Sequence, residues 1–80
     1  MSIIKYMKFY KPLRGINYFT IVFDDTSYNT YDKSGDISNY CKRDVDYKYE
    51  DWLEDFLLYN ELITDEAEIA KLMLVVNGIL

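Results

Sequence analysis

The chain has 80 residues, half of them apolar and nine of them tyrosine, with no histidine and a formal net charge of −5. This length fits a single domain, residues 1–80, which buries roughly 60 % of the surface that its unfolded chain exposes. Histidine is the usual general base near neutral pH and the commonest transition-metal ligand, so the composition argues against an enzyme, a metal site or a cofactor.

The lysine and cysteine positions predict the cellular compartment. Cys41 is the single cysteine, so no disulfide framework forms, and a lone thiol fits a reducing compartment. Lys5, Lys8 and Lys11 interrupt the first residues, which leaves no apolar core for a signal peptide. The longest apolar run, residues 72–76, is far shorter than the roughly 20 residues of a membrane span. We therefore expect a cytoplasmic protein without membrane association.

The first half of the chain has the pattern of strands. Alternating β-branched and aromatic residues predict a strand over residues 3–10, and the strongest strand pattern follows over residues 18–23. Two further strands are predicted near residues 28–32 and 37–42, with polar turn sequences between successive strands. Residues 1–43 thus form the sheet half of the domain, an antiparallel meander.

The second half changes to a helical period. Asp44 and Asp46 are candidate caps for a helix at about residues 47–61, and Thr64 is a candidate N-cap for a second helix that stops at Gly78. Residues 44–80 therefore predict an acidic helical hairpin. The fold class is α+β, an antiparallel sheet of three to four strands with two C-terminal helices packed on one face. The first helix has an apolar face made of Tyr49, Trp52, Leu53, Phe56 and Leu57.

Charge is segregated between the two halves. Residues 1–43 carry seven Lys or Arg against four acids, whereas residues 44–80 carry ten acids against two Lys. The resulting net charges of +3 and −8 favour a charged partner. Acids in the first turn of the second helix would repel phosphates, which argues against direct nucleic-acid binding.

Four acids of the first helix form the sharpest candidate site. Glu50 and Glu54, and likewise Asp51 and Asp55, are four residues apart, so each pair is separated by about 6 Å along the helix axis. That separation is similar to the spacing of backbone phosphates. The plain interpretation is a solvated face that keeps the protein soluble. The functional interpretation is a DNA mimic, which occupies a basic groove on another protein.

Tyrosines on the predicted strands form a second candidate surface. Tyr6, Tyr10 and Tyr18 are candidates for one sheet face. They form an exposed patch if the helices leave that face open. Tyrosine supplies a large contact area at low entropic cost, so an exposed patch of this kind is typical of protein binding.

Two short segments carry a family resemblance. With Ile4-Lys5-Tyr6 in the first strand and Asn17-Tyr18 opening the second, the chain resembles small phage-encoded anti-CRISPR proteins, in particular a sheet-plus-two-helices inhibitor of the type I-F surveillance complex. The resemblance implies that Tyr6 contacts the CRISPR backbone subunits. At the second contact of that family, the end of strand two, this chain has Asp24 instead of an aromatic residue.

Two functions of different classes follow. The first is a non-enzymatic inhibitor, acting in the host cytoplasm, that binds a host protein or ribonucleoprotein complex with a basic groove, of the CRISPR-Cas or restriction type. The alternative is an antitoxin-like or regulatory module, which binds one protein or forms a homodimer through Trp52, Phe56 and Leu58. An enzyme with Cys41 as its nucleophile is the least favoured hypothesis.

Overall fold

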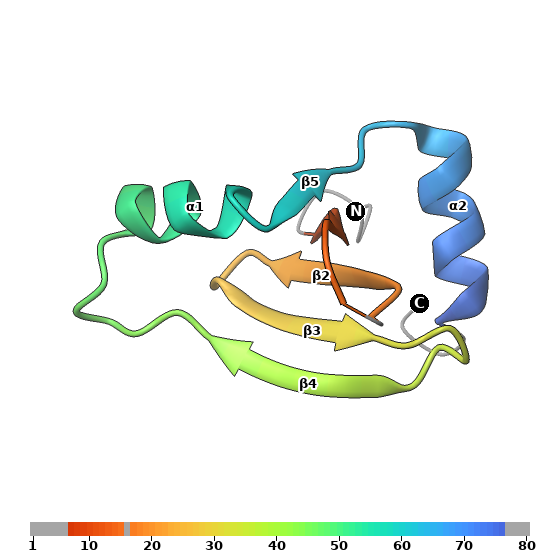
Figure 1. The fold of residues 1–80 in the computed structure, drawn as a ribbon, viewed down its shortest axis with the longest axis horizontal. Helices are drawn as coiled ribbons and strands as arrows, with labels where there is room; N and C mark the ends of the chain where they lie inside the picture. Colours follow the sequence, from red (N-terminus) through yellow and green to blue (C-terminus); the bar gives the residue numbers. More distant parts are fainter. Residues whose placement is uncertain (1–6, 16, 77–80) are drawn as a thin grey trace.

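The computed structural model describes residues 7–15 and 17–76, and it confirms the α+β class. The fold consists of an antiparallel sheet and two helices that pack on it (Figure 1). The elements in chain order are β1 (Met7–Pro12), β2 (Phe19–Phe23), β3 (Ser27–Tyr31), β4 (Ile37–Lys42), α1 (Tyr49–Leu57), β5 (Asn60–Leu62) and α2 (Glu66–Val75).

The described part of the sheet has five strands in the order β4-β3-β2-β1-β5. The predicted meander of four strands is therefore confirmed, and β5 adds a fifth strand beside β1. Within β5, Asn60 pairs with Pro12 and Leu62 pairs with Tyr10. Because β5 separates α1 from α2, the two helices do not form the predicted hairpin.

The predicted first helix is shortened to make this strand. The amides of Leu58 and Tyr59 donate to the carbonyls of Asp55 and Phe56, three residues back, which tightens the last turn of α1. The Asn60 side chain then donates to the Phe56 carbonyl at 3.0 Å. These bonds satisfy the carbonyl groups at the helix end. The chain then continues as β5, which pairs with β1 at the edge of the sheet.

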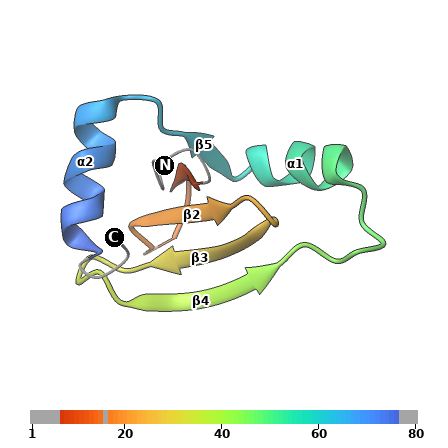
Figure 2. The same ribbon diagram turned by 180° about the vertical axis from the view of Figure 1, so that it is seen from behind.

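The two helices lie against opposite faces of the sheet, not on one face as predicted. On one face, α2 packs Leu72 and Val76 against a cluster that includes Phe9 and Ile21. On the other face, Trp52 of α1 packs against the alternating residues of the same strands. Figure 1 and Figure 2 show the helices at opposite ends of the molecule with β5 between them. Because β5 is an edge strand, the chain can leave it on the face opposite to the one it came from.

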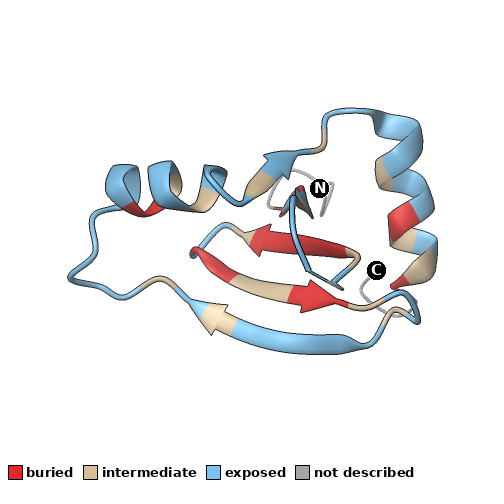
Figure 3. Ribbon diagram, viewed as in Figure 1, coloured by how far each residue is buried: buried red, intermediate tan, exposed pale blue. Residues whose placement is uncertain are grey.

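The main core lies between the sheet and α2. Its centre is a set of fully buried side chains on β1, β2 and β3, and burial is concentrated in β2 and β3 (Figure 3). The Phe19 ring stacks on Tyr31 with centroids 4.9 Å apart and planes 12° apart. The largest of these buried side chains are Tyr31, Phe9, Phe19 and Ile21.

The helix caps differ from the predicted ones. Lys48 precedes α1 and Asp65 precedes α2, and neither side chain makes a capping hydrogen bond. The carboxylate of Asp44 instead accepts the amide of Asp46 at 2.9 Å, which forms a local turn. The predicted stop at Gly78 lies outside the described residues.

Replacing Gly35 with alanine is expected to destabilise the fold more than replacing Gly15. Both glycines have a positive φ, +87° and +91°, so alanine costs about 1–2 kcal/mol at either position through backbone strain. A Cβ at Gly35 would also collide with the Val75 carbonyl at the end of α2, whereas a Cβ at Gly15 meets no atom within 4 Å. We expect the collision to add about 1–3 kcal/mol, measured by urea unfolding. Equal losses in the two variants would contradict this contact.

Candidate protein-binding surface

An aromatic cluster fixes α1 on the sheet. The Trp52 ring stacks on Phe56 at 5.0 Å and lies 5.9 Å from Tyr28, while Phe56 meets Tyr10 edge-on at 4.9 Å. Trp52 is only 7 % exposed. Burial raises the pKa of both Tyr10 and Tyr28 above the ordinary value, so their phenols stay neutral in this cluster. These contacts orient α1 and with it the face that α1 turns to solvent.

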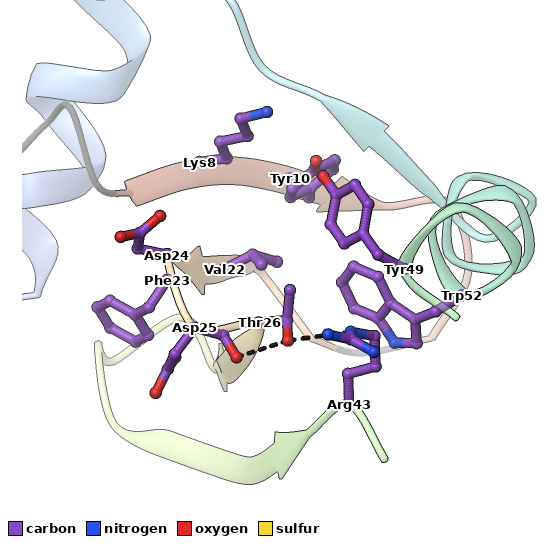
Figure 4. Close-up of a pocket in the computed structure, with 10 residues that line it drawn as sticks. All are labelled: Lys8, Tyr10, Val22, Phe23, Asp24, Asp25, Thr26, Arg43, Tyr49 and Trp52. Atoms are coloured by element: carbon purple, nitrogen blue, oxygen red, sulfur yellow. Dashed lines mark hydrogen bonds between the residues drawn. The ribbon is translucent and has the colours of Figure 1, made fainter. Parts of the chain in front are cut away.

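Arg43 holds the segment that leads into α1. Its Nε donates to the Thr26 hydroxyl at 3.1 Å, and its guanidinium donates to the Tyr47 carbonyl. The guanidinium carbon also lies 6.0 Å from the centre of the Tyr49 ring, the first residue of α1. Arg43 thereby connects the β2–β3 turn to the start of the helix (Figure 4).

Thr26 adopts a backbone conformation that β-branched residues rarely adopt. Its φ is 62°, in the left-handed region, where a β-branched side chain is strained. The Thr26 amide donates to the Phe23 carbonyl at 2.9 Å, which closes the turn, and the Arg43 amide donates to the Thr26 carbonyl at 3.1 Å. Strain of this kind persists where surrounding bonds fix the residue, and Arg43 supplies those bonds.

A depression of about 370 Å³ lies beside these residues (Figure 4). Hydrogen bonds from the hydroxyl and amide of Ser27 hold the pKa of Asp25 below its ordinary value, so this carboxylate stays charged. Lys8 and Arg43 line the depression together with Asp24 and Asp25. Because cations and carboxylates share its wall, the depression does not favour a ligand of one charge.

The four predicted acids, Glu50, Asp51, Glu54 and Asp55, are all exposed on α1, and together they are the acidic stripe. With 3.6 residues per turn, they occupy the side of the helix opposite the apolar face that Tyr49, Trp52, Leu53 and Phe56 form together. Among the described residues, 7–15 and 17–76, the one ion pair joins Lys42 to Asp25 at 3.8 Å. Within this part of the chain, the acidic stripe therefore has no cation that neutralises it.

The predicted tyrosine patch is not formed by the residues that the structure describes. Tyr6 lies outside them. Tyr10 is 3 % exposed beneath α1, and Tyr18 is half-buried against the cluster on the α2 side. The expectation was wrong because α1 covers the sheet face that was predicted to be open.

The homodimer surface predicted from Trp52, Phe56 and Leu58 is also not formed. Trp52 and Phe56 belong to the cluster under α1, and Leu58 alone, at 64 % exposed, is free to contact another molecule. Sequence reasoning also missed the exposed apolar side chains beside it, Leu57 and Tyr59. The helical pattern placed Leu57 on the buried face, but Leu57 is five residues beyond Trp52, about 140° around the helix, and it lies at the margin of that face.

Sequence reasoning missed the roles of Arg43 and Thr26. Their side chains are brought together by the β3–β4 pairing, in which residues far apart in the chain become neighbours. The polar turn at residues 24–27 predicted only that the chain reverses there.

Neither a membrane-spanning helix nor a metal-binding cluster is found where the structure describes the chain. None of these helices is long and apolar enough to cross a bilayer, and no three acidic or cysteine side chains are placed so that they could hold a metal ion. No protein-family model matches the chain, and no curated protein or solved structure is significantly similar to it.

Proposed function

We propose that this protein is a non-enzymatic inhibitor of a bacterial defence complex that handles nucleic acid, of the CRISPR-Cas or restriction type. The acidic stripe of α1 binds a basic groove on that complex and excludes the nucleic acid. The observation that carries this proposal is that four carboxylates stand exposed on a helix held in place by Trp52 and Arg43. Preorganisation of this kind lowers the entropic cost of binding.

The energetics of α1 support a role in binding. Like charges four residues apart on a helix are destabilising by about 0.2–0.5 kcal/mol per pair, and the acidic stripe contains two such pairs. Glu54 and Asp55 also lie near the C-terminal end of α1, where the helix dipole disfavours negative charge. Glu50 and Asp51 lie in the first turn, where the same dipole favours acids, and this gain is opposed by the repulsion within the two pairs. The four acids together therefore add little to stability, and a partner with complementary charge accounts for them better.

Phage infection assays test the proposal. Phage that carries a sequence targeted by a type I-F system forms few plaques on immune cells, and we expect expression of this protein to restore plaque formation. A variant with Glu50→Gln, Asp51→Asn, Glu54→Gln and Asp55→Asn should lose this effect. Its fold should persist, because exposed charges contribute about 0–1 kcal/mol each and these charges repel one another.

A matched control separates the acidic stripe from net charge. The substitutions Glu61→Gln, Asp65→Asn, Glu66→Gln and Glu68→Gln remove the same number of exposed acids from β5, from the residue before α2 and from the first turn of α2. We expect this control to protect phage as the native protein does. Equal protection by the stripe variant, or no protection by the native protein in hosts with type I-F or restriction systems, would refute the proposal.

An antitoxin-like or regulatory module is the second candidate. The observation that favours it is the apolar surface at the end of α1, where Leu57, Leu58 and Tyr59 are 45 %, 64 % and 61 % exposed. A module of this kind would bind its partner through Leu58 and would tolerate salt, because apolar contacts are not screened.

A further inference from the structure

The outer edge of β4 carries a second inference, which is independent of the acidic stripe. β4 forms one border of the sheet, and no other described element lies beyond it (Figure 1, Figure 2). Edge strands are normally protected by prolines, by inward-pointing charges or by a covering segment. The strand Ile37–Lys42 contains no proline and no acid, and its single charge is at the end.

The bulge in β4 shortens the part of this edge that can pair regularly with another strand, but it leaves several residues available. Thr30 pairs with Asn39 and Tyr31 pairs with Ile37, so Ser38 is the extra residue. The Ser38 hydroxyl bonds to the Thr30 carbonyl at 3.1 Å, which fixes the bulge. The regular part of the edge therefore begins at Asn39.

The backbone groups that face outward from β4 follow from the ladder. In an antiparallel pair, residues that bond to the neighbouring strand alternate with residues whose groups point away. The Arg43 amide donates to the Thr26 carbonyl at 3.1 Å, so Arg43 faces β3. Counting back in twos, Cys41 and Asn39 also face β3, so the residues between them, Tyr40 and Lys42, direct their N–H and C=O groups out of the sheet. These groups lack a partner among the described strands.

We propose that β4 pairs with β4 of a second copy of this chain, antiparallel about a two-fold axis at Tyr40. In this register Tyr40 faces Tyr40 of the copy, and the outward groups of both strands bond to each other. Lys42 faces Ser38 of the copy, so no like charges are opposed within residues 38–42. The side chains of Tyr40 and Ile37, 60 % and 57 % exposed, become partly covered.

Other symmetric registers either oppose like charges or extend past the end of the strand. An axis at Lys42 would oppose two ammonium groups, and an axis at Cys41 would extend the pairing beyond the end of β4. The opposite edge of the sheet is a poor alternative. β5 has three residues with Glu61 at its centre, so a symmetric pairing of β5 strands opposes two carboxylates.

A disulfide tests this register, because Asn39 faces Cys41 of the copy in a non-hydrogen-bonded pair. The Cα atoms of such a pair are about 4.5 Å apart, within the range that a disulfide spans. The two native Cys41 residues would be roughly 8 Å apart, which is too far. We expect Asn39→Cys to form a disulfide-linked dimer under mild oxidation, whereas the native protein does not. Glu61→Cys in a Cys41→Ser background is the control for the β5 edge and should stay monomeric.

Analytical ultracentrifugation of the native protein tests the dimer itself. We expect a concentration-dependent dimer that higher salt strengthens, since each copy carries a net charge of −5. Tyr40→Asp, at a position outside the core, should abolish the dimer because two carboxylates would meet on the axis, and it should keep the melting temperature that the native protein has at concentrations where it is monomeric. The proposal is overturned by a native monomer at all concentrations, by a dimer that Tyr40→Asp leaves intact, or by a dimer that Asn39→Cys does not cross-link. None of these results bears on the acidic stripe.

Discussion

Replacing Trp52 with alanine will lower the free energy of unfolding by about 3–5 kcal/mol. The indole is 7 % exposed and contacts Phe56 and Tyr28, so its removal leaves a cavity between α1 and the sheet. A small domain has a total stability of about 5–15 kcal/mol, and 80 residues fall toward the lower end, so much of this protein will be unfolded at 37 °C.

Circular dichroism in urea measures this loss, because Trp52 is the single tryptophan and the variant has no indole fluorescence. Leu58→Ala on the same helix is the control, and it should change the stability by less than about 0.5 kcal/mol because Leu58 is largely exposed. An unchanged midpoint for Trp52→Ala would mean that α1 does not dock through this residue.

Phe19→Ala is expected to have a similarly large effect through the opposite face of the sheet. Phe19 is fully buried, and the centre of its ring lies 4.9 Å from that of Tyr31 and 6.5 Å from that of Phe9, both stacked on it. Truncating a buried phenylalanine costs about 3–5 kcal/mol. Thermal unfolding should show the loss, whereas Leu74→Ala on the exposed side of α2, at a position 81 % exposed, should leave the melting temperature nearly unchanged. Equal melting temperatures for native protein and Phe19→Ala would place the core elsewhere.

Local sequence patterns predicted the elements that local preferences decide. The run of β-branched and aromatic residues at 18–23 differs from β2 by one residue, and β4 has its predicted bounds. β5 could not be predicted in this way. Asn60–Leu62 continue the helical pattern of the preceding residues, and they become a strand because β1 offers a free edge. That edge is a non-local feature that no window of sequence contains.

The faces of the sheet were harder to predict than its strands. Phe19, Thr20, Ile21 and Val22 are all buried, so β2 has no alternation that marks an open side. Tyrosine adds to the ambiguity because it suits both buried and exposed positions, and Tyr10 is buried where exposure was expected. The acidic stripe was placed outward correctly because the apolar residues of α1 pack on the sheet, which leaves the other side of the helix to its charged residues.

Calorimetric titration of a purified type I-F surveillance complex tests the binding role of the acidic stripe most directly. We expect the native protein to bind, to compete with target DNA, and to lose affinity as sodium chloride is raised. The variant without the four carboxylates of α1 should bind at least about tenfold more weakly, a change of about 1.4 kcal/mol, with less dependence on salt. The control with neutralised acids on β5 and α2 should match the native protein. Equal affinity of the stripe variant and the native protein at low salt would contradict the proposed role of α1.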